Sequence, residues 1–271
     1  MVIVQGVTSP APSPRDVLSR PAAGPDLVLR YADHADGLVD VFLPPGLGRP
    51  VDPAPLLVLL HGGFWRQEFG RRHLRPLAAG LVREGIVVAT PEYRRTGGAG
   101  GWPQTADDVE RSLATTPGLV EAAAPGGIDP AAPAVVSGHS AGGHLAMWAG
   151  LRAGSARIRA VVALAPVSDL RYAARCNLDR GATQALLGGE PDAMPDRYTD
   201  ADPLRLGLGD VPVTIVQGTD DEQVPVEMNR LVAADHPGIT YVELEGVDHF
   251  ALIDPLSPAF RDHVLPTLRG D

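Results

Sequence analysis

A series of short, continuous apolar runs constrains the fold of this chain more than any other feature. The runs lie at 56–60, 86–89, 134–137, 158–164 and 213–216. An apolar run without alternation is typical of a strand that is buried on both faces. Segments with helical spacing lie between or after these runs, at 74–82, 105–115, 141–153 and 226–234. This order predicts an α/β fold in which helices cover a parallel sheet.

The two ends of the chain complete the predicted domain. Alternating stretches at 27–31 and 38–43 favour an antiparallel pair at one edge of the sheet. A last strand is expected at 240–244 and a last helix at 258–268. About eight strands account for a single domain over 26–271. Residues 1–25 hold five prolines and are expected to form an irregular arm.

One segment, 167–207, interrupts the alternation because it contains no apolar run of strand type. An insertion after a central strand lies close to the carboxyl ends of the strands, where α/β sheets bind their ligands. We therefore expect 167–207 to form a short cap over the binding site.

The pentapeptide G-H-S-A-G at 138–142 follows a predicted buried strand and precedes a predicted helix. In that context G-x-S-x-G is typical of a nucleophile elbow, a tight turn that holds a serine above the sheet. Ser140 is the predicted nucleophile, and the amide of Ala141 points at the site from the helix N-terminus. His139 and His144 are expected to pack within the structure.

A serine nucleophile needs a general base and a carboxylate that orients the base. In the elbow architecture the acid follows the serine along the chain, and the histidine follows the acid. Asp220 and Asp221 come after the run at 213–216, and His249 comes after the strand at 240–244. His249 is the predicted base. Asp221 is favoured over Asp220 because it heads the run that leads to Pro225 and the next helix.

The run at 56–60 is followed by H-G-G-F-W at 61–65. Glycines allow backbone amides to approach a substrate oxygen, so Gly63, supported by Gly62, is expected to form an oxyanion hole with Ala141. His61 is expected to organise this turn through hydrogen bonds.

Aromatic side chains beside this turn, in the glycine-rich loop that follows and in the predicted cap are candidates for the substrate pocket. They are Phe64, Trp65, Trp102, Tyr172 and Tyr198.

Composition excludes several classes of function. With 33 acidic and 23 basic residues the net charge is −10, which disfavours binding to nucleic acid or to an anionic membrane. Cys176 is the single cysteine, so no disulfide forms within the chain, and this fits a reducing compartment. No signal peptide or apolar run of about 18 residues is recognised, and the eight histidines lack metal-ligand spacing. We expect a cytoplasmic protein without a metal or cofactor.

These motifs together resemble the α/β-hydrolase superfamily, in its esterase and lipase branch. The chain is most similar there to kynurenine formamidase (arylformamidase)-like serine hydrolases: 61–65 matches their H-G-G-x-W signature, 248–250 their D-H-F motif, and 31–44 their first hairpin. The resemblance covers about residue 27 to the end. It implies a mostly parallel sheet of about eight strands, hydrolysis of a small amide or ester through an acyl-enzyme, and compatibility with a homodimer.

Three functions remain open on these residues. The resemblance implies N-formyl-kynurenine or a similar aryl formamide as substrate. Because H-G-G-x-W also occurs in related esterases, the alternative is a carboxylesterase acting on short-chain or aryl esters, including acetylated sugars. A non-catalytic binding protein on a hydrolase scaffold is disfavoured, since every triad and oxyanion position is filled.

Overall fold

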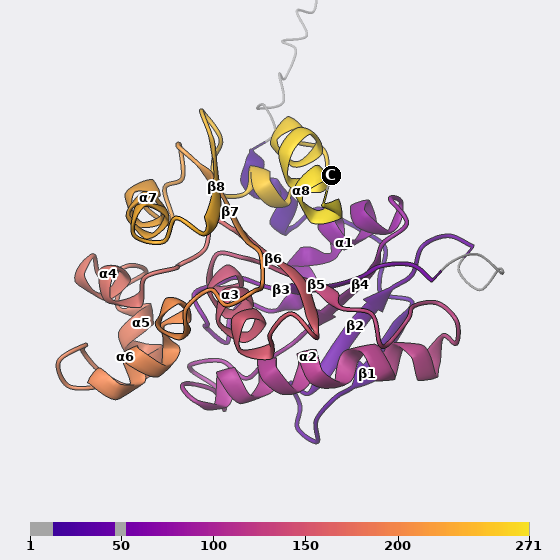
Figure 1. The fold of residues 1–271 in the computed structure, drawn as a ribbon, viewed down its shortest axis with the longest axis horizontal. Helices are drawn as coiled ribbons and strands as arrows, with labels where there is room; N and C mark the ends of the chain where they lie inside the picture. Colours follow the sequence, from indigo (N-terminus) through magenta and orange to yellow (C-terminus); the bar gives the residue numbers. More distant parts are fainter. Residues whose placement is uncertain (1–12, 47–52, 271) are drawn as a thin grey trace, which may run out of the picture.

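The computed structural model describes residues 13–46 and 53–270 (Figure 1). Its centre is an eight-stranded sheet in the order β1-β2-β4-β3-β5-β6-β7-β8. The strands are β1 (Leu27–Arg30), β2 (Leu38–Phe42), β3 (Leu56–Leu60), β4 (Val87–Pro91), β5 (Ala134–His139), β6 (Ile158–Leu164), β7 (Val213–Gly218) and β8 (Ile239–Leu244). Strand β2 runs antiparallel to β1 and β4, and the pairs from β4 to β8 are parallel. The predicted antiparallel edge and the mostly parallel sheet are therefore confirmed.

Helices pack on both faces of this sheet. They are α1 (Arg75–Val82), α2 (Gln104–Ala123), α3 (Ala141–Ala153), α4 (Leu170–Arg175), α5 (Ala182–Leu187), α6 (Pro195–Ala201), α7 (Val226–Asp235) and α8 (Leu265–Arg269). Shorter turns are the 3-10 helices η1 (Pro14–Leu18), η2 (Arg71–Leu74), η3 (Pro203–Leu206) and η4 (Ala251–Ile253) and the π-helical turn η5 (Phe260–Val264).

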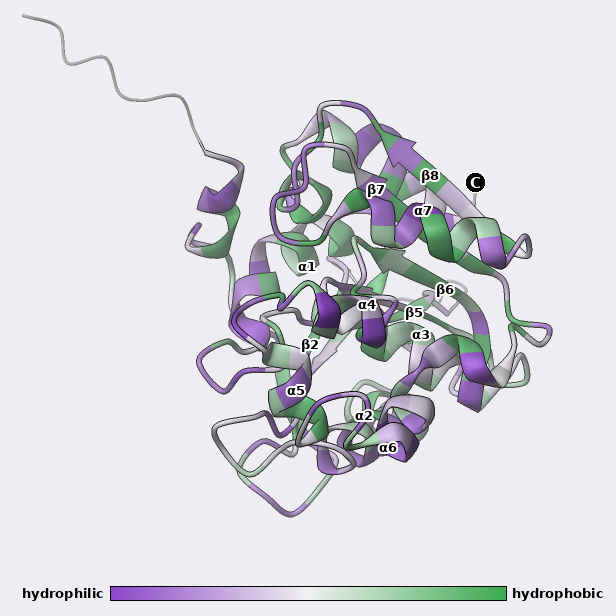
Figure 2. Ribbon diagram, turned by 90° about the vertical axis from the view of Figure 1, so that its left-hand side faces the viewer, coloured by the Kyte–Doolittle hydropathy of each residue, from purple (hydrophilic) through white to green (hydrophobic). Residues whose placement is uncertain are grey.

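Successive residues of each central strand enter opposite cores. In β3, Leu57 and Leu59 belong to the core that includes residues of α1 and α8, while Leu56, Val58 and Leu60 belong to the core that includes residues of α2, α3 and α7. Figure 1 shows α1 and α8 on one side of the sheet and α2 on the other, and the central strands are hydrophobic between these layers in Figure 2. This two-faced burial explains why the strand sequences are continuous apolar runs.

Two helices differ from the expected bounds. Helix α2 starts at Gln104 and continues through Pro117 to Ala123, well beyond the predicted 105–115. Proline removes one backbone hydrogen bond, but Thr116 and Val120 beside it are fully buried, so packing keeps the helix going. The predicted helix at 258–268 is divided into η5 and α8, and Pro266 lies in the first turn of α8, where its missing N–H costs little.

The insertion at 167–207 folds as the helices α4, α5, α6 and η3, and in the described chain no strand lies within it. Figure 1 shows α4, α5 and α6 grouped on the left-hand side of the molecule. Hydrogen bonds fasten this group to helix α3: Nε2 of His144 donates to the carbonyl of Ala201 at 2.8 Å, and Nε1 of Trp148 donates to that of Asp200 at 2.7 Å. Burial lowers the pKa of His144 to about 4, so the ring is neutral at pH 7.

The predicted arm is only partly visible, since residues 1–12 lie outside the described residues. The expectation of an irregular arm is wrong for Pro14–Leu18, which form η1. Ser13 and Asp16 form a capping box, and Pro14 occupies a position at the helix start that needs no free N–H. Across the ranges that the structure describes, no helix combines the length and the apolar character needed to cross a membrane.

Candidate active site

The nucleophile elbow lies between β5 and α3. Ser140 has φ 59° and ψ −120°, a strained backbone conformation that aims its side chain away from both elements. A Cβ on Gly138 would come within 2.1 Å of the carbonyl oxygen of Gly142, and one on Gly142 within 2.2 Å of that of Leu60. Both positions of the motif therefore exclude any side chain, which explains the G-x-S-x-G pattern.

Asp221 holds His249 from the loops after β7 and β8. Nδ1 of His249 lies 2.6 Å from Oδ2 of Asp221, which also accepts a hydrogen bond from Nε2 of Gln217 at 2.9 Å. Its other oxygen accepts from the backbone amides of Gln223 and Val224, both at 2.8 Å. A carboxylate only accepts hydrogen bonds, so Nδ1 of His249 must carry the proton that it donates to Asp221. Nε2 of His249 is then unprotonated and can act as the base.

Of the two candidate acids, only Asp221 contacts His249. Asp220 is exposed and accepts a hydrogen bond from the hydroxyl of Thr219 at 3.2 Å. The acid predicted from the sequence is thus the one that the structure places beside the histidine.

Ser140 and His249 line one cavity of about 700 Å³. The hydrogen bonds among the described residues do not include a direct bond between these two side chains. Such bonds between nucleophile and base are often long without substrate and tighten when it binds. Nucleophile and base therefore line the same cavity, and we expect the hydrogen bond between them to form when an ester binds there.

His139, beside the nucleophile, supports the catalytic histidine. Its Nε2 donates to the backbone carbonyl of His249 at 2.9 Å, and the two rings lie 4.2 Å apart. Burial lowers the pKa of His139 well below its usual range, so the ring is neutral. The sequence predicted a packing role for His139, and the structure adds a contact that positions the loop of His249.

The oxyanion turn packs directly on the elbow. A Cβ on Gly62 would lie 2.8 Å from the carbonyl oxygen of His139, and Gly63 has φ 105° with the ring of Phe69 packed against it. Among the described residues, the amides of Gly63 and Ala141 have no hydrogen-bond acceptor. Both donors are therefore available to a substrate oxygen.

His61 organises this turn from behind. Its Nε2 lies 2.6 Å from Oε1 of Glu92 and its Nδ1 lies 2.8 Å from the carbonyl oxygen of Gly62. The ring of Tyr93 stacks on it at 4.2 Å, and the Tyr93 hydroxyl donates to the carbonyl of His61 at 2.7 Å. These contacts agree with the organising role predicted for His61.

Glu92 is the charged centre of this support. Arg95 lies 2.7 Å from one of its oxygens and Arg71 lies 3.3 Å from the other. Burial by itself would raise the pKa of Glu92, but His61 and Arg95 outweigh it and lower the pKa to about 2. The carboxylate is therefore ionised throughout the ordinary pH range.

Replacing Glu92 by glutamine is expected to lower the free energy of unfolding at pH 7 by about 3 kcal/mol, because Arg71 and Arg95 lose their buried partner. Since folding lowers the pKa of Glu92 from 4.5 to about 2, the wild type gains stability from this group above pH 4.5 and loses it as the pH falls toward 2. Urea unfolding down to about pH 3 should show a steeper loss of stability in the wild type than in the variant.

The matched control for this variant is Glu84→Gln. Glu84 pairs with Arg269 at the surface, where both side chains are 37% exposed, so the cost should stay below about 1 kcal/mol. Equal effects of the two substitutions would contradict the role assigned to Glu92.

The two tryptophan candidates do not line the cavity. Trp65 is fully buried under the oxyanion turn, with its ring 5.4 Å from His144. Trp102 packs on Trp148 at 4.9 Å, and its Nε1 donates to Asp200 at 2.7 Å. The lining of the cavity includes neither side chain, so the expectation of a pocket role is wrong for them.

Of the remaining aromatic candidates, only Phe64 lines the cavity. Tyr198 is buried and its hydroxyl donates to the carbonyl of Gly189, while Tyr172 is half-buried against the core. Neither tyrosine lines the cavity, so the expectation of a pocket role is wrong for both. Apolar lining residues that the sequence analysis missed are Leu18, Phe69 and Phe250.

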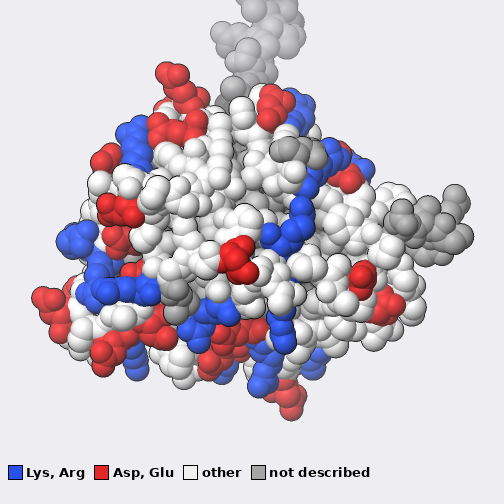
Figure 3. Space-filling view, in the orientation of Figure 1, with Lys and Arg blue, Asp and Glu red and all other residues white. Residues whose placement is uncertain are grey.

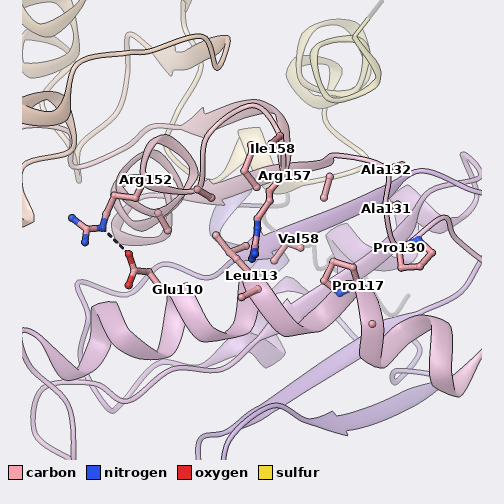
Figure 4. Close-up of a pocket in the computed structure, with 16 residues that line it drawn as sticks. Val58, Glu110, Leu113, Pro117, Pro130, Ala131, Ala132, Arg152, Arg157 and Ile158 are labelled. Carbon is pink, nitrogen blue, oxygen red and sulfur yellow. Dashed lines mark hydrogen bonds and ion pairs between the residues drawn. The ribbon is translucent and has the colours of Figure 1, made fainter.

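A second cavity, of about 620 Å³, lies between α2 and α3 (Figure 4). Val58, Leu113 and Pro117 line it, and the ion pair of Arg152 with Glu110 stands beside it. It contains no triad or oxyanion residue. The two cavities are of similar size, so the chemistry of the lining, rather than the volume, identifies the reactive site.

A metal site and a basic patch for an anionic partner are two other kinds of site that a chain can carry. Among the described residues, no group of three His, Cys, Asp or Glu side chains is arranged to hold a metal ion. On the face shown in Figure 3, arginines are interspersed with acidic residues rather than gathered into one basic patch.

Comparisons with known proteins agree with this geometry. The BD-FAE family model matches residues 39–235. Esterase LipC of Mycobacterium tuberculosis (strain ATCC 25618 / H37Rv) is 29% identical over 250 residues, an alignment that covers 83% of this chain and 59% of LipC. The chain thus spans about three fifths of the length of that relative.

Solved structures show the same architecture. A truncated form of a carbohydrate esterase from gut microbiota has a TM-score of 0.74 at 20% identity, covering 92% of this chain and 99% of its own. Butyrate-bound Est2, an esterase of Thermogutta terrifontis, has a TM-score of 0.66 at 23% identity, covering 90% and 92%. These similarities confirm the α/β-hydrolase fold. Because the BD-FAE model matches well over half of its length, this chain belongs to the BD-FAE family.

Proposed function

We propose that this protein is a serine esterase that cleaves small carboxylic esters through an acyl-enzyme. The observation that carries this proposal is the arrangement at one cavity. Ser140 stands on a strained elbow, His249 is oriented by Asp221, and the amides of Gly63 and Ala141 have no acceptor among the described residues. Nucleophile, oriented base and oxyanion donors are the parts that acyl transfer requires.

In the proposed reaction, Oγ of Ser140 attacks the ester carbonyl carbon while Nε2 of His249 takes the hydroxyl proton. The oxyanion that forms accepts hydrogen bonds from the amides of Gly63 and Ala141. When it collapses, the alcohol leaves with the proton from His249, and the acyl group stays on Ser140. Water then attacks the acyl-enzyme, gives a proton to His249, and releases the acid, while His249 returns the proton to Ser140.

Within this activity, we infer that the substrates are short-chain esters, including acetylated sugars. Support comes from relatives whose names say esterase or carbohydrate esterase, and from the butyrate bound to Est2. The aryl formamide alternative is supported by the resemblance of the sequence at 31–44, 61–65 and 248–250. Ester hydrolysis is therefore the first function to test.

The test compares kcat/KM for p-nitrophenyl acetate, p-nitrophenyl butyrate, an acetylated xylose and N-formyl-kynurenine. We expect at least one ester to exceed about 10⁴ M⁻¹s⁻¹, the lower range for dedicated enzymes, and the formamide to fall at least about a hundredfold below it. Turnover of the formamide above every ester would replace the proposal by the formamidase function. Absence of turnover of all four would favour a binding protein.

A further inference from the structure

The side of the cavity that receives the alcohol can be identified from the triad. His249 delivers its proton to the leaving alcohol, so that part of an ester lies on the His249 side. The wall there includes Phe250, whose ring centre is 5.1 Å from that of His249. The guanidinium carbon of Arg15 lies 5.4 Å from the ring centre of Phe250. The cationic side chain of Arg15, from the N-terminal segment, therefore lies beside the part of the cavity that receives the alcohol.

Arg15 is held in place by its own segment. Val17 is fully buried against the core, and Arg20 forms a bidentate ion pair with Asp254. Together with the capping box around η1, these contacts fix the backbone on both sides of Arg15. The segment lies outside residues 39–235, which match the family model.

Most charged side chains of the cavity lining are already paired. Arg71 and Arg95 bind buried Glu92 and also bind Asp40 and Asp36, respectively. Asp179, from the cap, is paired with Arg66. Burial, followed by the nearby charge of His61, lowers the pKa of His73 to about 3, so this lining residue is neutral.

Three charged lining residues have no ion pair to any described residue. They are Arg15, Arg72 and Glu68. Two cations against one anion leave a net positive charge on the lining. Arg72 belongs to η2, which contacts η1 and so lies on the same side as Arg15. Asp16, the residue after Arg15, belongs to the capping box, where its carboxylate accepts a hydrogen bond from the amide of Ser13 at 2.9 Å.

We propose that the alcohol part of the preferred ester carries a carboxylate, which binds the guanidinium of Arg15, with Arg72 beside it. The inference rests on the proposed esterase activity. Guanidinium matches a carboxylate with two parallel donors, and an exposed arginine on a fixed backbone loses less freedom on binding than one on a mobile loop. Arg15 is thereby a specificity residue, separate from the groups that carry out acyl transfer.

The test uses two matched acetates, para-acetoxybenzoate and para-acetoxybenzamide, which differ in the charge of the alcohol part. The measured quantity is the ratio of kcat/KM for the anionic ester to that for the neutral one. Differences in intrinsic reactivity cancel when this ratio is compared between variants. We expect Arg15→Gln and Arg72→Gln each to lower the ratio about fivefold, and Glu68→Gln to raise it.

The matched control is Arg157→Gln. Arg157 is also exposed and has no ion pair to a described residue, but it lines the other cavity (Figure 4). Its substitution should leave the ratio unchanged. Raising the salt concentration to about 1 M should lower the wild-type ratio toward that of Arg15→Gln, because exposed charges are then screened.

The possible results separate the two proposals. Equal ratios for the wild type, Arg15→Gln, Arg72→Gln and Arg157→Gln, with both esters hydrolysed, overturn the carboxylate site and leave the esterase standing. Hydrolysis of neither ester by the wild type overturns the esterase and this inference with it. If Arg15→Gln does not fold, Arg72→Gln and the salt dependence of the wild type decide the question in the same way.

Discussion

Substitution of Ser140 by alanine is expected to lower kcat for ester hydrolysis by about 10⁵-fold or more, because it removes the nucleophile of the proposed acyl-enzyme. The fold should be retained, since alanine keeps the Cβ and the elbow is set by Gly138 and Gly142. The measurements are kcat on the best ester, labelling by a fluorophosphonate probe, and thermal unfolding. Labelling should disappear together with activity.

The control for this variant is another buried serine three residues earlier in the chain. Ser137 lies in β5, and its hydroxyl donates to the carbonyl of Val162 at 2.7 Å. We expect Ser137→Ala to lower the free energy of unfolding by about 1 kcal/mol and to keep the activity. Full activity in Ser140→Ala would refute the proposed mechanism.

The second large effect is expected for Asp221→Asn, with a loss in kcat of about 10³- to 10⁴-fold. An amide at this position no longer requires a proton on Nδ1 of His249, so the base can adopt the wrong tautomer. The buried carboxylate is the acceptor for four donors, so stability should also fall. Steady-state kinetics and urea unfolding measure the two effects separately.

Asp220→Asn is the matched control because it makes the same chemical change one residue earlier. Asp220 is exposed and contacts only the Thr219 hydroxyl among the hydrogen bonds of its side chain. Its substitution should change kcat by less than about threefold. A larger loss in Asp220→Asn than in Asp221→Asn would show that the acid has been misassigned.

Local patterns in the sequence predict the sheet well. The runs at 56–60 and 158–164 are β3 and β6 with the same bounds. Burial on both faces leaves a continuous apolar signal that needs no knowledge of the neighbouring strands. For helix α2, by contrast, the spacing predicts too short a helix, because the packing of Thr116 and Val120 stabilises it beyond Pro117.

The pocket was much harder to predict than the triad. Trp65 and Phe64 are adjacent aromatic residues in the same motif, yet Trp65 is buried beneath the turn and Phe64 lines the cavity. Both side chains are apolar, and the apolar pattern of the sequence would be the same whichever of the two lined the cavity. Which of them faces the substrate depends on the direction of two side chains at positive φ, 48° and 55°.

Local sequence patterns are enough to predict the strand–helix order, the elbow around Ser140 and the succession of acid and histidine. These depend on residues that are close along the chain, where apolar spacing and glycine positions act directly. No local pattern, in contrast, predicts that the segment of Arg15 forms a wall of the cavity beside Phe250. That wall depends on the ion pair between Arg20 and Asp254, 234 residues apart. A local pattern predicts whether a side chain will be buried or exposed. Which distant residue it contacts depends on how the whole chain packs.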